Sequence, residues 1–288
     1  MNAQRTRRPG TPRSPLPAGL ARYRGRAGVP AQVEFERLRT LHRVAARRRL
    51  RRALIVPGVF GVLAAFALVV GVLTLVGGVS GAAAVLLGVV AAAVAAVPPL
   101  RRARAVWAVP EEVDRWRRGA VGERATAVTL RGVEALGWPV LHDRTIPGSA
   151  ANIDHLVVGP GGLFVLDSKH WTGRLRLDGG QLWRGRLPLG GVSATADWES
   201  QQVVAALAPL LPDGWSVPVR TVVVVHGAVV PDGAVTTTTG NAPARVVTVV
   251  GGDVLSAWLD QQAAVFTATQ RALLASFCEQ ALPPYTTD

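Results

Sequence analysis

The longest feature of the hydrophobic pattern is an apolar run of 48 residues from Ala53 to Leu100, which contains no Asp, Glu, Lys, Arg or His. A helix needs about 20 residues to cross a hydrocarbon core about 30 Å thick, so this run is too long for one span and suits two. The glycine-rich segment 77–81 is a natural turn. The pattern therefore predicts a transmembrane helical hairpin within 53–100, with spans near residues 54–76 and 80–100. A buried core hairpin or a signal peptide would have a shorter apolar region.

Beyond residue 110 the pattern becomes that of an α/β domain, which we place at residues 111–288. Helical spacing of apolar residues predicts helices, and short apolar runs bounded by Gly or Pro predict strands. The predicted helices are 111–136, 194–211, 253–263 and 268–281, and the predicted strands are 140–142, 153–158, 162–167, 221–225 and 246–250, with a hairpin of 174–177 and 181–183. Continuous apolar strands require a sheet covered on both faces, so the mixed order predicts an α/β/α sandwich.

Positive charge is concentrated in residues 1–52, which carry 15 arginines against Glu34 and Glu36. This surplus of 13 equals the formal net charge of the chain. Residues 1–30 are rich in Pro, Gly and Arg, so we expect residues 1–52 to form a largely disordered basic arm that ends in a short helix within 31–52. The 17 basic and 17 acidic residues after position 52 balance, and the basic pI therefore predicts no basic surface on the folded domain.

Arginines flank both outer ends of the apolar run, whereas the turn between the spans has none. By the positive-inside rule, both termini and the α/β domain face the cytoplasm, at the plasma (inner) membrane. The arginine-rich arm could also contact anionic lipid. The only cysteine is Cys278, which excludes an intrachain disulfide and favours a reducing compartment.

Side chains that suit a metal site stand at the ends of two neighbouring predicted strands. Asp154 begins one strand, and Asp167 and Lys169 close the next. Residues two apart in a strand share a face, so Asp167 and Lys169 should point the same way. Two carboxylates form a hard oxygen site suited to Mg²⁺ or Mn²⁺, and a neighbouring lysine can orient a water as an ammonium or deprotonate it as a neutral amine. Phosphodiester cleavage needs this combination, and Glu123 on the preceding helix is a further candidate carboxylate.

Each of these residues alone has a simpler explanation. An Asp at a strand end is more often a solvated terminus than a ligand, and an Asp-x-Lys pair is not specific. The set is stronger because Lys169 is the only lysine among 32 basic residues. The histidines at 142, 155, 170 and 226 lack the spacing of a zinc site, so we interpret them as strand or surface residues.

The order of these motifs resembles the nuclease-related domain (NERD) family of the PD-(D/E)xK nuclease-like superfamily. The resemblance covers roughly residues 115–230. It is carried by Gly119, Gly122 and Glu123, then Leu141-His142-Asp143, then Asn152-Ile153-Asp154-His155, and then the run from Gly162 to Gly173 that includes Asp167-Ser168-Lys169-His170-Trp171. The resemblance implies a restriction-endonuclease-like α/β/α sandwich with a mixed sheet.

The resemblance also implies roles for individual residues. Asp154 and Asp167 would bind the metal and Lys169 would be the catalytic lysine. Glu123 would assist from the first helix of the domain. Gln201 would belong to the downstream helix of the site, with the neighbouring Gln202 as the alternative. The family commonly carries Glu at the position of Asp167, and the shorter side chain moves the carboxylate by about one bond.

Two function classes follow from the sequence. The first is a membrane-anchored, Mg²⁺- or Mn²⁺-dependent nuclease that hydrolyses nucleic acid, with DNA favoured, at the cytoplasmic face. The second is a catalytically inactive nuclease fold that binds nucleic acid or a protein partner at the membrane. The balanced charge after residue 52 favours the second, because a domain that grips several phosphates normally has a basic excess.

Overall fold

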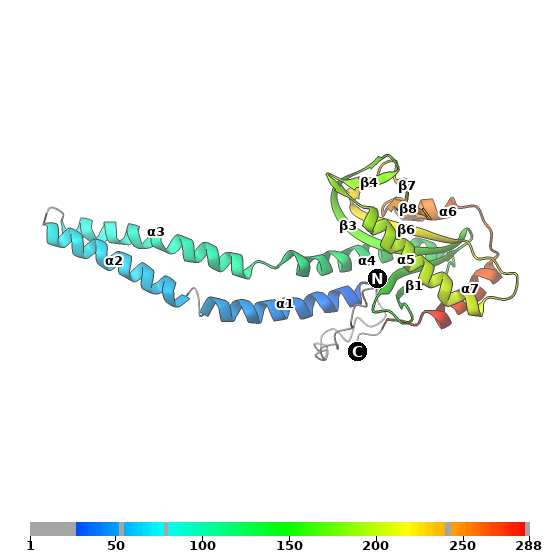
Figure 1. The fold of residues 1–288 in the computed structure, drawn as a ribbon, viewed down its shortest axis with the longest axis horizontal. Helices are drawn as coiled ribbons and strands as arrows, with labels where there is room; N and C mark the ends of the chain where they lie inside the picture. The colour runs from blue at the N-terminus through cyan, green and yellow to red at the C-terminus, as the bar shows by residue number, and fades with distance from the viewer. Residues whose placement is uncertain (1–26, 52–54, 78–79, 240–242, 286–288) are drawn as a thin grey trace, which may run out of the picture. The chain divides into compact units, whose positions relative to one another are not determined.

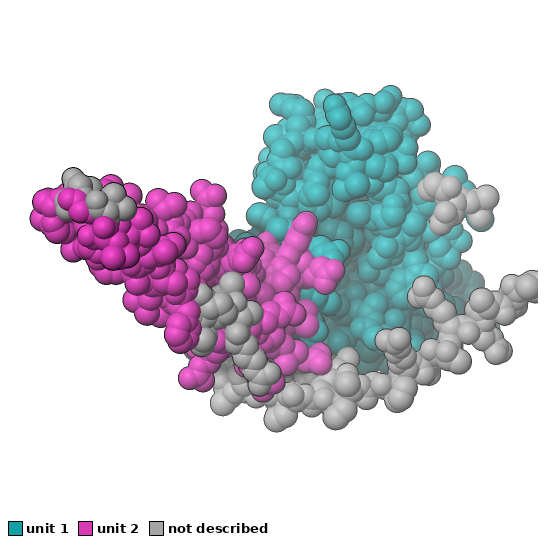
Figure 2. All heavy atoms as spheres, turned by 60° about the vertical axis from the view of Figure 1, so that its left-hand side comes forward, with its two compact units in different colours: residues 1–34, 115–288 teal, residues 35–114 magenta. Residues whose placement is uncertain are grey.

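The structure is a computed structural model that describes residues 27–51, 55–77, 80–239 and 243–285 (Figure 1). Most of the arm predicted at residues 1–30 lies outside the described residues. The chain divides into two compact units (Figure 2). One unit contains residues 35–114, and the other contains residues 1–34 and 115–288.

The unit at 35–114 is helical. It contains most of α1 (Val29–Leu50), then α2 (Val56–Val76) and α3 (Gly81–Trp107), which pack against each other as a hairpin. The packing is close at Gly88, where a β-carbon would lie 2.7 Å from a methyl carbon of Val70. Helices α2 and α3 lie where the two spans were predicted. Helix α3 continues past Leu100, because the Arg and Ala residues that follow are good helix formers.

Helices α2 and α3 are long and apolar enough to cross a membrane, by length and composition. None of the window Gly58–Leu75 and 11% of the window Gly81–Trp107 is buried inside the protein. Large apolar side chains such as Phe60 and Leu86 are exposed on both helices. A core helix of a soluble protein would bury these side chains, since their exposure to water is unfavourable.

The other unit is built on a mixed sheet with the strand order β1-β2-β3-β6-β8-β7. The strands are β1 (Val140–Thr145), β2 (Asn152–Gly159), β3 (Gly162–Asp178), β6 (Val219–Val229), β7 (Ala234–Thr238) and β8 (Val246–Gly251). The central strands β3, β6 and β8 run parallel, and β1, β2 and β7 add antiparallel pairs at the two sides. Beyond the sheet, β3 pairs with β4 (Gln181–Arg184), which pairs with the short β5 (Leu187–Pro188).

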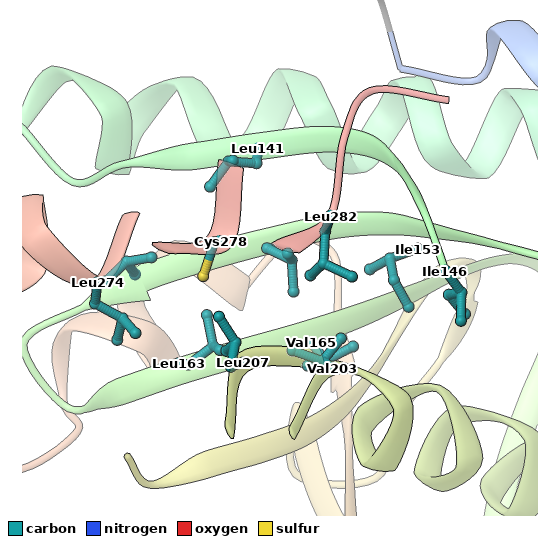
Figure 3. Close-up of a cluster of buried hydrophobic side chains, with 12 residues drawn as sticks. Leu141, Ile146, Ile153, Leu163, Val165, Val203, Leu207, Leu274, Cys278 and Leu282 are labelled. Atoms are coloured by element: carbon teal, nitrogen blue, oxygen red, sulfur yellow. The ribbon is translucent and has the colours of Figure 1, made fainter. Parts of the chain in front are cut away.

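Helices cover both faces of this sheet. Helices α5 (Gly190–Leu207) and α7 (Ala268–Ala281) pack on one face through a buried cluster that includes Leu163, Val203 and Leu274 (Figure 3). A short 3-10 helix, η3 (Ala208–Leu210), follows α5. Helices α4 (Glu111–Ala135) and α6 (Leu255–Asp260) pack on the other face through a second cluster that includes Leu130, Phe164 and Leu255. The predicted α/β/α sandwich with a mixed sheet is therefore confirmed.

The structure differs from the predicted elements at several places, of which three bear on the site and its sheet. Strand β3 is one continuous strand through residues predicted as two, because Leu175 and Leu182 of its hairpin enter a third buried cluster. Helix α5 begins at Gly190 rather than at residue 194. Strand β7 was not predicted, although its threonines are β-branched residues that favour strands.

Candidate metal and catalytic site

Asp154 and Asp167 stand opposite each other at the point where β2 and β3 separate. The last backbone pair of the β2–β3 ladder before this point joins His155 to Leu166. At the next position the Asp154 side chain replaces a backbone partner, because its Oδ2 accepts a hydrogen bond of 2.8 Å from the N–H of Ser168. Residues directly opposite in antiparallel strands point to the same face, so both carboxylates face the side covered by α5.

Lys169 lies on the same face as Asp167, two residues further along β3. Its Nζ donates a hydrogen bond of 2.6 Å to Oδ1 of Asp167. The Asp167 side chain is 6% exposed and the Lys169 side chain is 30% exposed, so the carboxylate is buried and the lysine side chain is partly accessible to solvent. Ser168, between Asp167 and Lys169, points to the opposite face of the sheet. Its hydroxyl donates a hydrogen bond of 2.8 Å to the hydroxyl of Thr126 on α4.

Glu123 reaches this cluster from α4, because the helix packs closely on β3. A β-carbon at Gly122 would lie 3.2 Å from backbone atoms of Lys169 and His170, so only glycine allows this approach without a shift of the backbone. The Glu123 side chain is buried, at 7% exposure. The pKa of Glu123 is raised to about 8, mainly by burial and then by the charge of Asp143, with a smaller contribution from Asp167, while the charge of Lys169 opposes them.

Glu199 of α5 joins the cluster and was missed in the sequence. The pKa of Glu199 is raised to about 9. Burial is the largest cause, the charges of Asp167 and Asp154 act in the same direction, and the charge of Lys169 opposes them. A signal was present, because α5 carries only two acidic residues in an otherwise uncharged helix, and Glu199 lies three residues after the buried Ala196. Helical spacing thus directs Glu199 toward the sheet.

Gln201 lies on the same helix but has another partner. Its side-chain amide donates a hydrogen bond of 2.6 Å to Oδ2 of Asp197, one turn earlier. The same oxygen lies 3.9 Å from Nε of Arg245. The structure therefore groups Gln201 with Asp197 and Arg245, and the neighbouring Gln202 is partly exposed.

The charges of the cluster are mutually dependent. Burial raises the pKa of Asp154 well above its usual range, and the charges of Glu123 and Asp167 act in the same direction. Burial alone would lower the pKa of Lys169, but Asp167 and then Asp154 outweigh burial and raise it. Lys169 thus keeps its proton, whereas Asp154, Glu123 and Glu199 resist ionisation in the absence of further positive charge.

The donor set of this cluster fits a divalent cation. Oδ2 of Asp167 and Oε2 of Glu123 are buried and have no hydrogen-bond partner within the described part of the chain. Carboxylate oxygens are the ligands that Mg²⁺ and Mn²⁺ prefer, and a cation would offset the repulsion that raises the pKa values of Asp154 and Glu123.

The cluster is not a closed metal cage. Across the described ranges, no group of three His, Cys, Asp or Glu side chains is already gathered around one point as a set of ligands. Lys169 occupies one oxygen of Asp167, and the Ser168 N–H occupies one oxygen of Asp154. Mg²⁺ commonly binds through one or two carboxylates and completes its shell with water and substrate phosphate, which is the open arrangement that these oxygens allow.

Comparison with known families agrees with this geometry. The family model described as "Nuclease-related domain" (NERD) matches residues 118–226. The chain carries a nuclease-related domain. The matched range contains Glu123, Asp154, Asp167, Lys169 and Glu199, together with Gln201. The chain matches no curated protein and no solved structure.

A polar network behind the site holds α4 of the nuclease-related domain on the sheet. The Thr126 hydroxyl accepts from Ser168 and lies 2.8 Å from Nε2 of His226 on β6. The imidazoles of His142 and His155 lie edge to face, with their Nδ1 atoms 2.7 Å apart. These contacts join β1 to β2, and join β3 and β6 to α4, so the buried His155 and the partly buried His142 and His226 act as structural residues.

Proposed function

We propose that the nuclease-related domain hydrolyses phosphodiester bonds of nucleic acid, with DNA favoured, and that it uses Mg²⁺ or Mn²⁺. The observation that carries the proposal is the convergence of three elements on one pair. Asp167 and Lys169 of β3 are hydrogen-bonded to each other, and Asp154 of β2 lies opposite them. Glu199 of α5 is close enough for the charges of all three to shift its pKa.

Asp154 and Asp167 would hold the cation, assisted by Glu123. A divalent cation in such a site lowers the pKa of bound water and neutralises charge on the phosphate. Lys169 is fixed by Asp167 and stays protonated, since the carboxylates raise its pKa. Its role is therefore to orient the attacking water or to stabilise charge on the phosphate oxygens, and it does not serve as the proton acceptor. Glu199 lies beside the pair as a further carboxylate that can hold a proton.

The hairpin next to the site supports a nucleic-acid substrate. Residues 111–288 contain 14 basic and 17 acidic residues, so the domain as a whole has no basic excess. Four of these basic residues lie on or beside the β3–β4 hairpin, against Asp178 alone: Arg174, Arg176, Arg184 and Arg186. The hairpin is the continuation of the strand that carries Lys169.

Two aromatic side chains accompany these arginines. The Arg184 guanidinium lies 5.5 Å from the ring centroid of Trp171, and that of Arg176 lies 5.6 Å from the ring centroid of Trp183. Arginines bind phosphates, and arginine and aromatic planes both stack on unpaired bases. The extension of the strand that carries Lys169 thus offers arginine and aromatic side chains to a nucleic acid.

The test is a cleavage assay on the full chain purified in detergent. Wild type should cleave DNA with Mg²⁺ or Mn²⁺ and be inactive with a chelator. Asp167→Ala and Lys169→Ala should each lower the rate by about two orders of magnitude or more, because each removes charge stabilisation at the reacting phosphate. Equal cleavage by all three proteins would refute the assigned site, and thermal unfolding checks that the variants are folded.

The second candidate function is binding without cleavage. It is favoured by two hydrogen bonds that already occupy oxygens of Asp154 and Asp167 within the protein. Under this alternative, DNA would bind equally well with and without divalent cations, and the bound DNA would stay intact. Substitution of Arg174 and Arg176 would then weaken binding and reduce its salt dependence, whereas Lys169→Ala would not.

We also assign the domain to the cytoplasmic face of the plasma membrane. Helices α2 and α3 have the length and composition of spans, and arginines flank their outer ends at positions 47–52 and 101–104. The positive-inside rule then places the glycine-rich turn outside and the nuclease-related domain in the cytoplasm.

A further inference from the structure

A basic pocket lies in the helical unit at 35–114, away from the nuclease-related domain in the sequence. It has a volume of about 340 Å³. The residues that line it come from α1 and from the end of α3: Arg39, His42, Arg43, Arg47, Trp107 and Val109. The candidate catalytic site contributes no residue to it.

The lining is basic on one side and apolar on the other. Arg39, Arg43 and Arg47 are spaced four residues apart, so their side chains form one stripe along α1. Like charges at this spacing repel each other, and the stripe is unfavourable without a counter-charge. Arg39 has Glu36 at 3.8 Å, but in the described part of the chain neither Arg43 nor Arg47 forms an ion pair. The pocket therefore has unbalanced positive charge.

A buried polar atom in the same pocket has no partner. Nε2 of His42 is shielded from solvent and makes no hydrogen bond to any described residue. A buried polar atom without a hydrogen bond costs free energy, and an imidazole N–H would donate to an oxygen of a bound anion. The unpaired Nε2 of His42 thus indicates a ligand that carries acceptor oxygens.

The position of the pocket along α3 indicates where that ligand comes from. The apolar run of α3 ends at Leu100, and Trp107 follows seven residues later in the same helix, about 10 Å further along its axis. The polar layer outside the hydrocarbon core is about 5 to 8 Å thick on each side. Arginine side chains reach several ångströms back toward the core, and Trp residues are enriched at this level. The pocket therefore lies within reach of lipid headgroups.

We infer that this pocket binds the phosphate-bearing headgroup of an anionic phospholipid in the leaflet next to α1. The guanidinium groups of Arg43 and Arg47 bind the phosphate oxygens, which they can contact in pairs. His42 donates a further hydrogen bond, and the Trp107 indole packs against the headgroup itself, in the pocket that it shares with the arginines. This site depends on membrane insertion of α2 and α3 and is independent of nuclease activity.

The test compares two variants with the same loss of charge. In Arg43→Gln/Arg47→Gln the pocket loses two of its lining arginines. Arg48→Gln/Arg49→Gln is the matched control, because both arginines are exposed on α1 and neither lines the pocket. The full chain is reconstituted in zwitterionic detergent, titrated with phosphatidylglycerol or phosphatidylcholine, and analysed by native mass spectrometry for retained lipid.

Wild type and the control should retain phosphatidylglycerol in preference to phosphatidylcholine. The pocket variant should lose roughly tenfold or more of this affinity, since one arginine near an anionic surface contributes about fivefold. An equal loss in the control would overturn the pocket, because net charge alone would then explain binding. Glycerol phosphate or an oligonucleotide that competes as strongly as the lipid would overturn the lipid assignment. Retention of neither lipid by wild type would overturn the site altogether.

Discussion

Nζ of Lys169 and Oδ1 of Asp167 are joined by a hydrogen bond of 2.6 Å on β3, just past the point where its pairing with β2 ends. This bond leaves Oδ2 of Asp167 buried and without a partner among the described residues. One carboxylate thus does two things, since it fixes an ammonium with one oxygen and leaves the other for a cation.

Glu199→Gln should lower DNA cleavage by about tenfold or more with little loss of stability. The change removes a carboxylate whose pKa is raised to about 9 by burial and then by Asp167 and Asp154, but it keeps the shape of the side chain. Gln202→Ala on the same helix is the control and should cleave like wild type. Rates are measured under single-turnover conditions, with thermal unfolding in parallel. Wild-type activity in Glu199→Gln would remove this residue from the site.

In a metal chelator, stability of the domain should fall as the pH rises from about 4.5 to about 8. The folded-state pKa of Glu123 is raised to about 8 by burial and then by Asp143, so in this window the native state binds more protons than the unfolded state. By linkage, the free energy of unfolding then decreases with rising pH, and the contribution of Glu123 is greatest below its unfolded pKa near 4.5.

Glu123→Gln should make this pH dependence shallower without abolishing it, because position 123 no longer titrates whereas Asp154 and Glu199 still do. Mg²⁺ should restore stability of wild type near pH 8, since a cation favours the ionised carboxylates. The measurement is the melting temperature against pH, with chelator and with Mg²⁺. A stability that rises from pH 5 to pH 8 in chelator, and equally in Glu123→Gln, would contradict the raised pKa.

Gly122→Ala should lower both stability and cleavage. The added β-carbon would lie 3.2 Å from backbone atoms of Lys169 and His170, so α4 must move away from β3 and take Glu123 with it. Overpacking of this kind typically costs about 1 to 3 kcal/mol. Gly132→Ala is the matched control on the same helix, because its β-carbon would lie 3.6 Å from the Ser256 hydroxyl, an ordinary contact. It should be neutral or slightly stabilising, since alanine favours helix.

Gly81→Cys should react with a membrane-impermeant maleimide added outside intact cells. A β-carbon at Gly81 meets no described atom within 4 Å, so the substitution fits at the start of α3. The native Cys278 is fully buried and should stay unlabelled. Asp213→Cys, at an exposed position of the α/β unit, should react only after permeabilisation. The reverse pattern would contradict the proposed orientation.

The fold class was predictable because its signals are local. Apolar strands such as Leu163–Leu166, together with helices of ordinary length, predict a sheet covered by helices on both faces. The structure confirms this α/β/α sandwich. The contact between Asp167 and Lys169 follows from the two-residue period of a strand. Strand β7 was missed because its run of threonines has no large apolar residue to mark it.

The rest of the site depends on tertiary packing, which local patterns do not contain. Glu199 joins the carboxylates only because α5 crosses the face of β3 at this point. Gln201 was chosen by resemblance, but in the structure its amide is bonded to Asp197. The roles of Asp154, Asp167, Lys169 and Glu123 in metal binding and catalysis remain predictions, although the structure brings all four together.

The most direct test of the account is the binding of Mn²⁺ to the full chain in the presence of a DNA oligonucleotide, measured by electron paramagnetic resonance. The account predicts that wild type binds the ion, that Asp154→Asn and Asp167→Asn each weaken binding by about tenfold or more, and that Asp197→Asn does not. If both site variants bound Mn²⁺ as tightly as wild type, the carboxylates at the β2–β3 junction would not be its ligands, and the nuclease mechanism proposed for them would be wrong.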